Sequence, residues 1–144
     1  MFSKTCEYGI KATVYVANVS KEKRRVQLKE IAEEIGSPAA FTAKIMQQLV
    51  RNNIIDSIKG PTGGFEINEQ QMKTTKLNQI VLAIDGDKIY NGCGLGLDKC
   101  NDLKPCPLHD KFKVIREDLK NMLTCTTIYE LTEGITEGLT WLKR

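Results

Sequence analysis

Three of the five cysteines and the only histidine lie in one glycine-rich segment in the second half of the chain. This segment, NGCGLGLDKCNDLKPCPLHD, holds Cys93, Cys100 and Cys106, and His109 follows three residues after the last cysteine. Thiolate and imidazole donors suit zinc, copper or an iron–sulfur cluster. His109 lies one helical turn beyond Cys106, so both side chains are expected to point the same way from the start of a helix.

The spacing of these cysteines bears on which metal they would hold. Six residues separate Cys93 from Cys100, and five separate Cys100 from Cys106. Zinc sites draw their ligands from tighter Cys-x2–4-Cys knuckles, so the longer gaps favour a larger metal unit, with structural zinc as the rival. Three unligated cysteines are disfavoured, because nothing in this polar loop would bury them. Cys6 and Cys125, outside the loop, are expected to be buried apolar residues.

Length and charge set the broad class of protein. The 144 residues fit one domain, or a small domain with a dimerisation extension. Residues 1–65 hold ten Lys and Arg against six Asp and Glu, whereas residues 66–144 hold eleven against twelve, so the first half is the one suited to meet phosphates. Without a targeting segment or a long apolar run, a cytoplasmic protein with no membrane partner is expected. With one histidine, no acid–base constellation indicates an enzyme.

The first half of the chain predicts a helix-turn-helix. Apolar spacing near 3.6 predicts a helix over about 4–19 and a short one over about 27–34, which Gly36 ends. A third helix over about 38–52 is expected to start with Ser37 as its N-cap and a proline in its first position. Two short helices joined by a tight turn form the helix-turn-helix pattern. The KEKRR run between the first two helices is expected to be a solvated connector.

Two strand-like runs follow, at 54–58 and 65–67, around the glycine-rich stretch 60–64. They predict a β-hairpin, and a helix-turn-helix followed by such a hairpin is a winged helix. The expected fold is therefore mainly α with a small β-hairpin wing. It comprises a winged helix-turn-helix domain over 1–74 and a dimerisation region with one long helix over 75–144.

The second half contributes the elements that hold the cysteines. A polar loop is expected over 68–74, a helix over about 76–84, and a loop over 85–106. A long helix starts at Pro107, and a second amphipathic stretch covers 127–142. The long helix carries apolar residues at intervals of four and three, a heptad seam that slightly favours a partner helix. These residues are Leu108, Phe112, Ile115, Leu119 and Met122.

The predicted DNA-reading surface combines the third helix with the wing. A recognition helix reads the major groove with side chains near its N-terminus. Gln pairs with adenine and Lys with guanine, whereas Ala offers a methyl contact to thymine, so modest direct readout is expected. The wing glycines allow close backbone approach. The residues expected to meet DNA are Pro38, Ala39, Ala40, Ala43, Lys44, Gln47 and Arg51 along the helix, and Lys59, Gly60 and Thr62 in the wing, with Lys4 as a further phosphate contact.

Taken together, SKTCEYGIKA, SPAAFTAKIMQQLVRNNII, KGPTGGFEI and the three-cysteine loop resemble the IscR/NsrR/RirA family of iron–sulfur transcription regulators. The resemblance covers nearly the whole chain. It implies a winged-helix homodimer with crossed long helices and a cluster held in the loop over 85–109. It also places the three family cysteines on Cys93, Cys100 and Cys106, and implies that cluster loading, type or redox state alters DNA binding.

The resemblance leaves the fourth cluster ligand open. In IscR-like members a histidine three residues after the last cysteine completes a [2Fe–2S] site, which here is His109. In NsrR-like members an acidic residue on the first helix of the other subunit takes this place, and the matching residue is Glu7. His109 and [2Fe–2S] are favoured over Glu7 and [4Fe–4S], although the first cysteine gap is one residue longer than in the IscR pattern. Ala43 and Lys59 replace a glutamate and an arginine of IscR-like members, so a different operator sequence is expected.

The sequence therefore predicts a homodimeric transcription regulator that binds a double-stranded DNA operator. An iron–sulfur cluster that senses redox state, nitric oxide or iron status is expected to modulate this binding. The alternatives are a clusterless or zinc-stabilised winged-helix regulator and a small iron–sulfur electron carrier. The helix-turn-helix and the wing argue against the electron carrier.

Overall fold

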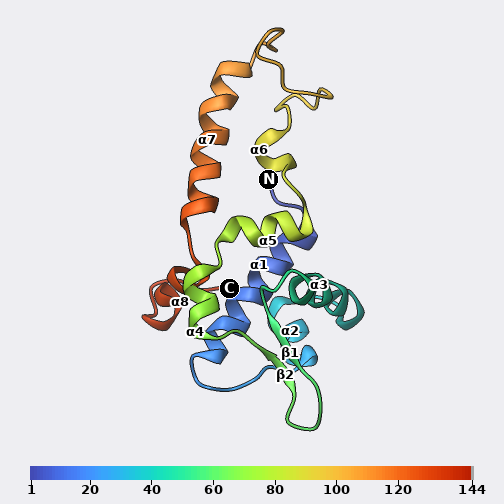
Figure 1. Ribbon diagram of the computed structural model, residues 1–144, viewed down its shortest axis with the longest axis vertical. Coiled ribbons are helices and arrows are strands. Elements are labelled where there is room, and N and C mark those ends of the chain that lie inside the picture. The colour runs from blue at the N-terminus through green and yellow to red at the C-terminus, as the bar shows by residue number, and fades with distance from the viewer. Residues whose placement is uncertain (144) are drawn as a thin grey trace.

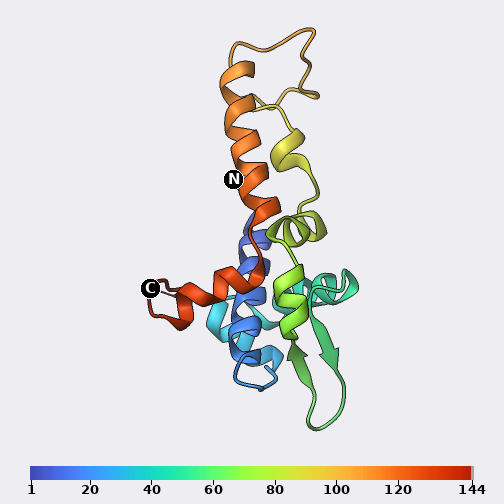
Figure 2. The same ribbon diagram turned by 60° about the vertical axis from the view of Figure 1, so that its left-hand side comes forward.

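The computed structural model describes residues 1–143. It is mainly helical with one two-stranded antiparallel sheet, which confirms the predicted fold class (Figure 1). A compact body carries the sheet at one end, and a long arm leads away from the body to the cysteine loop at the other end (Figure 2). The elements are α1 (Lys4–Ser20), α2 (Leu28–Ile35), α3 (Ala39–Arg51), β1 (Asp56–Ile58), β2 (Gly64–Glu66), α4 (Glu69–Thr74), α5 (Leu77–Ile84), α6 (Lys88–Asn91), α7 (His109–Cys125) and α8 (Ile128–Thr136).

Helix α1 is the centre of the body. The Ser3 hydroxyl accepts a hydrogen bond from the Cys6 N–H at 3.1 Å and so caps its first turn. Its residues Ala12 and Val16 are fully buried, and α2, α3, α5 and α8 all pack against it. A side chain at Gly9 would collide with Ile84 of α5, so the glycine allows these two helices to approach closely.

The helix-turn-helix forms as predicted, with one correction at the start of α3. Gly36 ends α2 in the left-handed conformation, with φ of 67°. Helix α3 then begins at Ala39 with Pro38 as its N-cap, so the expectation that Ser37 caps the helix is wrong. The backbone of Pro38 is extended, which moves the helix start onward by one residue. The turn instead buries Ser37, whose hydroxyl has no hydrogen-bond partner among the described residues.

The wing is a short hairpin that a third segment joins. Strands β1 and β2 pair antiparallel, with Ser57 opposite Phe65. Phe65 also exchanges two backbone hydrogen bonds with Val26, of 3.0 Å and 2.8 Å. The predicted strands extend further than the observed ones because Ile54 and Ile55 before the hairpin turn into the core and are almost fully buried. The core therefore fixes the base of the wing, while its tip lies away from the body (Figure 1).

The second half contains more helix than the sequence analysis predicts. Residues 69–74, expected to be loop, form α4, because Asn68 and Gln71 make a reciprocal capping box. Helix α6 is a single turn inside the expected loop 85–106. The amphipathic stretch 127–142 is helical only as far as Thr136. Among the residues that the structure describes, no helix is long and apolar enough to cross a membrane.

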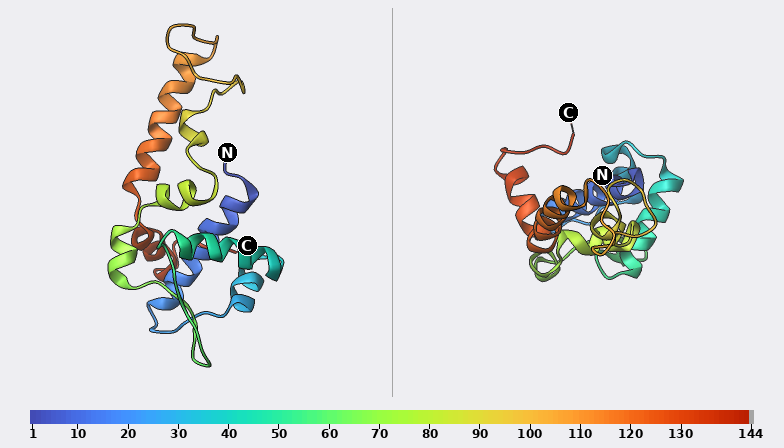
Figure 3. Two further views of the ribbon diagram at one scale, coloured as in Figure 1. Left: turned by 45° about the vertical axis from the view of Figure 1, so that its right-hand side comes forward. Right: turned by 90° about the horizontal axis from the view of Figure 1, so that it is seen from above.

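Helix α7 forms the arm and runs beside α6 (Figure 3). The residues of the predicted heptad seam differ in their surroundings along this helix. Leu119 packs against the core of its own chain, and Phe112 lies against Gly94 of the cysteine loop. Ile115 and Met122 are 57% and 46% exposed. Phe112 and Leu119 therefore pack within the chain itself, whereas Ile115 and Met122 present apolar side chains to solvent.

The two cysteines outside the loop differ in their surroundings. Cys6 is fully buried in the core, as expected. Burial raises the pKa of its thiol to about 12. Cys125 is exposed, so the expectation that it is buried is wrong. It is the last residue of α7, where the chain leaves the arm.

Candidate functional site

The cysteine loop is fastened to α7 at both ends. At its start, Arg116 of α7 donates a hydrogen bond of 2.7 Å to the carbonyl oxygen of Gly92. The Phe112 ring lies so close to Gly94 that a Cβ there would be 2.6 Å from ring carbons. At its end, the loop runs directly into the first turn of α7, where the His109 N–H bonds to the Cys106 carbonyl oxygen at 2.9 Å. The long helix is therefore the frame that positions the sulfur donors.

Cys93 lies in a setting that favours its thiolate. The backbone N–H groups of Leu95 and Leu97 lower the pKa of Cys93, and the Cys106 side chain and the positive charge of Arg116 lower it further. The Gly96 N–H bonds to the Cys93 carbonyl oxygen at 2.9 Å, which closes a tight turn after Cys93. The thiolate is the form in which cysteine binds metal. The effect of the Cys106 side chain on this pKa associates Cys106 with Cys93 as a first pair of candidate donors.

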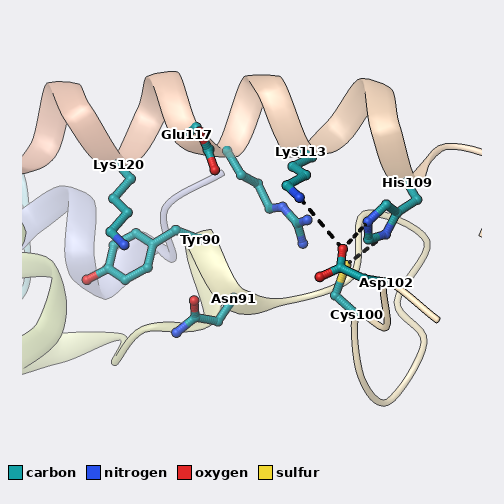
Figure 4. Close-up of a pocket in the computed structure, with 9 residues that line it drawn as sticks. Tyr90, Asn91, Cys100, Asp102, His109, Lys113, Glu117 and Lys120 are labelled. Carbon is teal, nitrogen blue, oxygen red and sulfur yellow. Dashed lines mark hydrogen bonds and ion pairs between the residues drawn. The ribbon is translucent and has the colours of Figure 1, made fainter. Parts of the chain in front are cut away.

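Cys100 and His109 make a second pair. The Cys100 Sγ lies 3.3 Å from Nδ1 of His109, whose side chain is only 7% exposed (Figure 4). The other ring nitrogen, Nε2, lies 2.7 Å from Oδ1 of Asp102, and Lys113 Nζ lies 3.8 Å from the same oxygen. The hydrogen bond to His109 and the charge of Lys113 hold the pKa of Asp102 below its ordinary value.

Beside this second pair is a cavity of about 300 Å³ between α6, the loop and α7. Its walls on the α7 side are charged and mostly positive (Figure 4). A positive wall suits a negatively charged occupant such as a thiolate-ligated metal unit. The residues that line it are Tyr90, Asn91, Cys100, Asp102, His109, Lys113, Arg116, Glu117 and Lys120.

The four predicted ligands thus lie in one loop and its adjoining helix, and a direct contact joins Cys100 with His109. Within residues 1–143 no three Cys, His, Asp or Glu side chains converge as they would around a single metal ion. Glu7, the alternative ligand, lies on α1, where it pairs with Lys4 at 3.1 Å with its side chain 41% exposed. The structure therefore places His109 beside Cys100 at the end of the cysteine loop, and Glu7 on α1.

The predicted DNA-contact residues lie along α3 and in the wing, apart from Lys4, which is the first residue of α1. All are exposed except Ala43, which is half-buried. The wing tip has its glycine-dependent shape, with φ of 105° at Gly60, and a Cβ at Gly63 would lie 2.1 Å from the Ile58 carbonyl oxygen. Between α3 and the wing is a cavity of about 440 Å³. Its lining residues are Leu28, Ala43, Gln47, Val50, Arg51, Ser57 and Phe65.

Contacts that the sequence does not predict hold the wing from outside the hairpin. Arg25, part of the KEKRR run, donates through Nε to Glu66 at 3.0 Å and through Nη1 to the Thr62 carbonyl oxygen at 3.0 Å. Gln27 Nε2 donates to the Gly63 carbonyl oxygen at 2.6 Å. The alternation of Arg25, buried Val26 and Gln27 is the signal for a short strand that could have indicated this third segment.

Comparison with known proteins identifies the family. The family pattern of Rrf2, described as an iron-dependent transcriptional regulator, matches residues 2–134. The chain belongs to the Rrf2 family. An HTH-type transcriptional regulator of Aquifex aeolicus is 33% identical over 133 residues, which are 91% of this chain and 90% of that protein. The regulator IscR of Klebsiella pneumoniae is 24% identical over 127 residues, which are 88% of this chain and 76% of that protein.

Solved structures show the same fold. CymR, the global cysteine regulator of B. subtilis, superposes with a TM-score of 0.75 at 18% identity, over 92% of this chain and 96% of that chain. IscR of T. potens superposes with a TM-score of 0.72 at 16% identity, over 98% of this chain and 92% of that chain. These matches confirm the winged-helix fold and a transcription regulator rather than an enzyme.

Proposed function

We propose that this Rrf2-family regulator binds its operator as a homodimer under the control of a [2Fe–2S] cluster held by Cys93, Cys100, Cys106 and His109. The observation that carries the proposal is the 3.3 Å contact between Cys100 Sγ and His109 Nδ1, at the end of a loop that also carries Cys93 and Cys106 and that α7 holds at both ends. In a binuclear cluster each iron takes two protein ligands, whereas structural zinc needs four donors around one ion.

The chemistry of the donor set fits such a group. Three thiols and one imidazole are the soft and intermediate donors that iron–sulfur clusters use. The lowered pKa of Cys93 favours its thiolate, and the positive side chains of Lys113, Arg116 and Lys120 line the adjoining cavity. When bound, the cluster would supply a reversible response to redox state, nitric oxide or iron supply. The contribution of the protein is to hold the cysteine loop against α7.

The exposed face of α7 supports the homodimer. Val114, Ile115 and Met122 are 62%, 57% and 46% exposed on the helix that projects from the body. Large apolar side chains exposed on a projecting helix are typical of a protein interface. We propose that two copies pair along it, so that residues 75–144 act as a dimerisation region with the cluster loop over 85–109, and residues 1–74 act as the DNA-binding domain.

On DNA we propose that the N-terminal end of α3 enters the major groove while the wing tip meets the flanking backbone or minor groove. Lys44 and Gln47 are the polar residues that face outward from α3, and Lys59 projects from the wing. Their exposure and the cavity between α3 and the wing support this role. The other proposed contacts are Pro38, Ala39, Ala40, Ala43, Arg51, Gly60 and Thr62.

The test begins with anaerobic purification, visible and Mössbauer spectra, and operator binding with and without the cluster. We expect Cys100→Ala and His109→Ala to abolish or alter the [2Fe–2S] spectrum while the protein remains folded. Cys125→Ala, which removes a cysteine outside the loop, is the matched control and should leave the spectrum unchanged. Full wild-type absorbance in Cys100→Ala would contradict the ligand assignment.

A second variant separates the two candidates for the fourth ligand. If His109 is the ligand, Glu7→Gln should keep the wild-type spectrum and His109→Ala should not. The reverse result would assign the site to Glu7 of the second chain. Colourless protein with stoichiometric zinc after anaerobic purification would instead support the zinc-stabilised regulator.

A further inference from the structure

We infer that Asp102 is a positioning residue that holds the imidazole of His109 in the tautomer with its proton on Nε2, so that Nδ1 is the atom presented for metal binding. This inference rests on the proposed cluster site, but its first test does not need the cluster. Asp102 lies in the loop between the second and third cysteines and is not one of the predicted ligands.

The two ring nitrogens of His109 face different partners. Nε2 lies 2.7 Å from Oδ1 of Asp102, and Nδ1 lies 3.3 Å from Sγ of Cys100 (Figure 4). An ionised carboxylate can only accept a hydrogen bond, so the proton of a neutral ring belongs on Nε2. The lone pair is then on Nδ1, directed at the neighbouring sulfur donor.

The separation of the two donor atoms fits a shared metal ion. With a sulfur ligand at about 2.3 Å and a nitrogen ligand at about 2.1 Å, tetrahedral geometry places the two donors about 3.6 Å apart. The Sγ–Nδ1 distance of 3.3 Å is close to this value. Nε2 faces a carboxylate instead, so its use as the ligand would require the ring to turn over inside its buried site.

The charged groups beside the His109 ring support Asp102 as the hydrogen-bond partner of Nε2. Lys113 Nζ lies 3.8 Å from the same carboxylate oxygen, so a positive charge stands beside the Asp102 carboxylate that faces Nε2. A carboxylate behind a metal-binding histidine fixes the orientation of the ring and raises the basicity of the ligand nitrogen. The Asp102 side chain is 76% exposed, so its replacement should remove this contact without opening the core.

The first experiment uses the full chain in its cluster-free, reduced form, labelled with ¹⁵N-histidine. Because the chain has one histidine, its long-range ¹H–¹⁵N spectrum reports on His109 alone. At a pH at which the ring is neutral, we expect the Nε2–H tautomer in the wild type and a mixture of tautomers in Asp102→Ala. Asp102→Asn keeps an accepting oxygen and should restore the wild-type tautomer, and Asp98→Ala in the same loop is the control.

The second experiment uses the reconstituted, reduced protein with ¹⁵N placed at Nδ1 or at Nε2. Pulsed electron paramagnetic resonance should show the strong ligand coupling for the Nδ1 label. In Asp102→Ala we expect faster loss of iron to a chelator, by about ten- to a hundred-fold, and a higher reduction potential. Asp98→Ala should change neither.

The outcomes separate this inference from the proposed function. A proton on Nδ1 in the wild type, or an unchanged tautomer in Asp102→Ala, would overturn the role of Asp102 even if a cluster forms. Strong coupling to Nε2 would overturn the assignment of Nδ1. A colourless wild-type protein with the expected tautomer would instead count against the cluster and leave the role of Asp102 in orienting the ring supported.

Discussion

Replacing Arg25 with alanine tests whether the wing is held in place from outside the hairpin. Its ion pair with Glu66 at 3.0 Å is partly exposed, at 37% and 36%, so solvent screening limits its contribution to about 0.2–1 kcal/mol. The hydrogen bond from Nη1 to Thr62, also solvent-exposed, adds about 1 kcal/mol. We therefore expect Arg25→Ala to reduce the free energy that keeps the wing in its ordered position by about 1–2 kcal/mol. If this order must be restored on binding, operator affinity falls by about five- to thirty-fold.

The assay is fluorescence anisotropy with operator DNA over a series of salt concentrations. Arg24→Ala is the matched control, because it removes the same charge from the next residue but breaks an ion pair with Glu30 rather than with the wing. If Arg25 positions the wing, affinity falls while the slope of log K against log salt is kept. If Arg25 contacts phosphate directly, the slope falls by about one.

Amide exchange supplies an independent measure of wing order. The Phe65 N–H bonds to the Val26 carbonyl oxygen at 2.8 Å, so it should exchange faster in Arg25→Ala and at the wild-type rate in Arg24→Ala. Three results would refute the reasoning: equal loss of affinity in both variants, a reduced salt slope in Arg25→Ala, or unchanged exchange at Phe65.

Three further predictions concern the dimer, the buried thiol and the wing tip. If the proposed dimer forms along α7, Ile115→Glu should convert it to monomer in light scattering, because it places a charge among the exposed apolar side chains of α7; Leu103→Glu, at a 92% exposed loop position, should leave the oligomeric state unchanged. Cys6, with its pKa raised to about 12 by burial, should resist alkylation in the native protein at pH 8 and react once urea unfolds it, whereas an equal rate in both states would contradict its burial. Gly63→Ala should weaken operator binding more than it lowers Tm, because the added Cβ collides with the wing backbone away from the core.

The sequence predicts those parts of the fold that local signals determine. Gly36 marks the end of α2 because it takes the left-handed conformation, and the apolar residues of α3 mark its buried face. The glycines between the two strand-like runs mark the wing tip. The pair Asn68 and Gln71 carried a capping signal of the same local kind, so α4 was within reach of sequence reasoning.

The remaining features depend on partners far away in the chain. Nothing local to Arg25 indicates that it meets Glu66, because the contact exists only once the wing has folded. The spacing of the heptad seam in α7 does not show that Phe112 packs on its own loop while Ile115 faces solvent. Likewise, nothing in the sequence distinguishes Asp102 from other polar loop residues. Its proposed role follows from its hydrogen bond with Nε2 of His109.

The route from the cysteine loop to the DNA surface runs along α7, because the loop and the wing lie at opposite ends of the molecule (Figure 2). At the far end of α7, the Thr126 carbonyl oxygen accepts from Leu77 N–H at 2.9 Å, and Ile128 N–H donates to the Thr75 carbonyl oxygen at 3.1 Å. Helix α5, which begins there, packs on both α1 and α3. Close-packed cores of this kind transmit rigid movements rather than deform gradually.

A change in the loop should therefore alter how the two DNA-binding domains of a dimer are spaced, and should leave the reading surface of each domain unchanged. Half-sites must lie at a set separation for both recognition helices to bind, so a small rotation of α7 against its partner changes affinity for the full operator. We expect cluster-loaded and cluster-free protein to prefer operators with different half-site spacing, and to bind a single half-site equally well. Anisotropy with a set of operators lengthened one base pair at a time measures this preference. If cluster loss weakened binding to a single half-site as much as to the full operator, the loop would have to act within one chain, through α5 on α3.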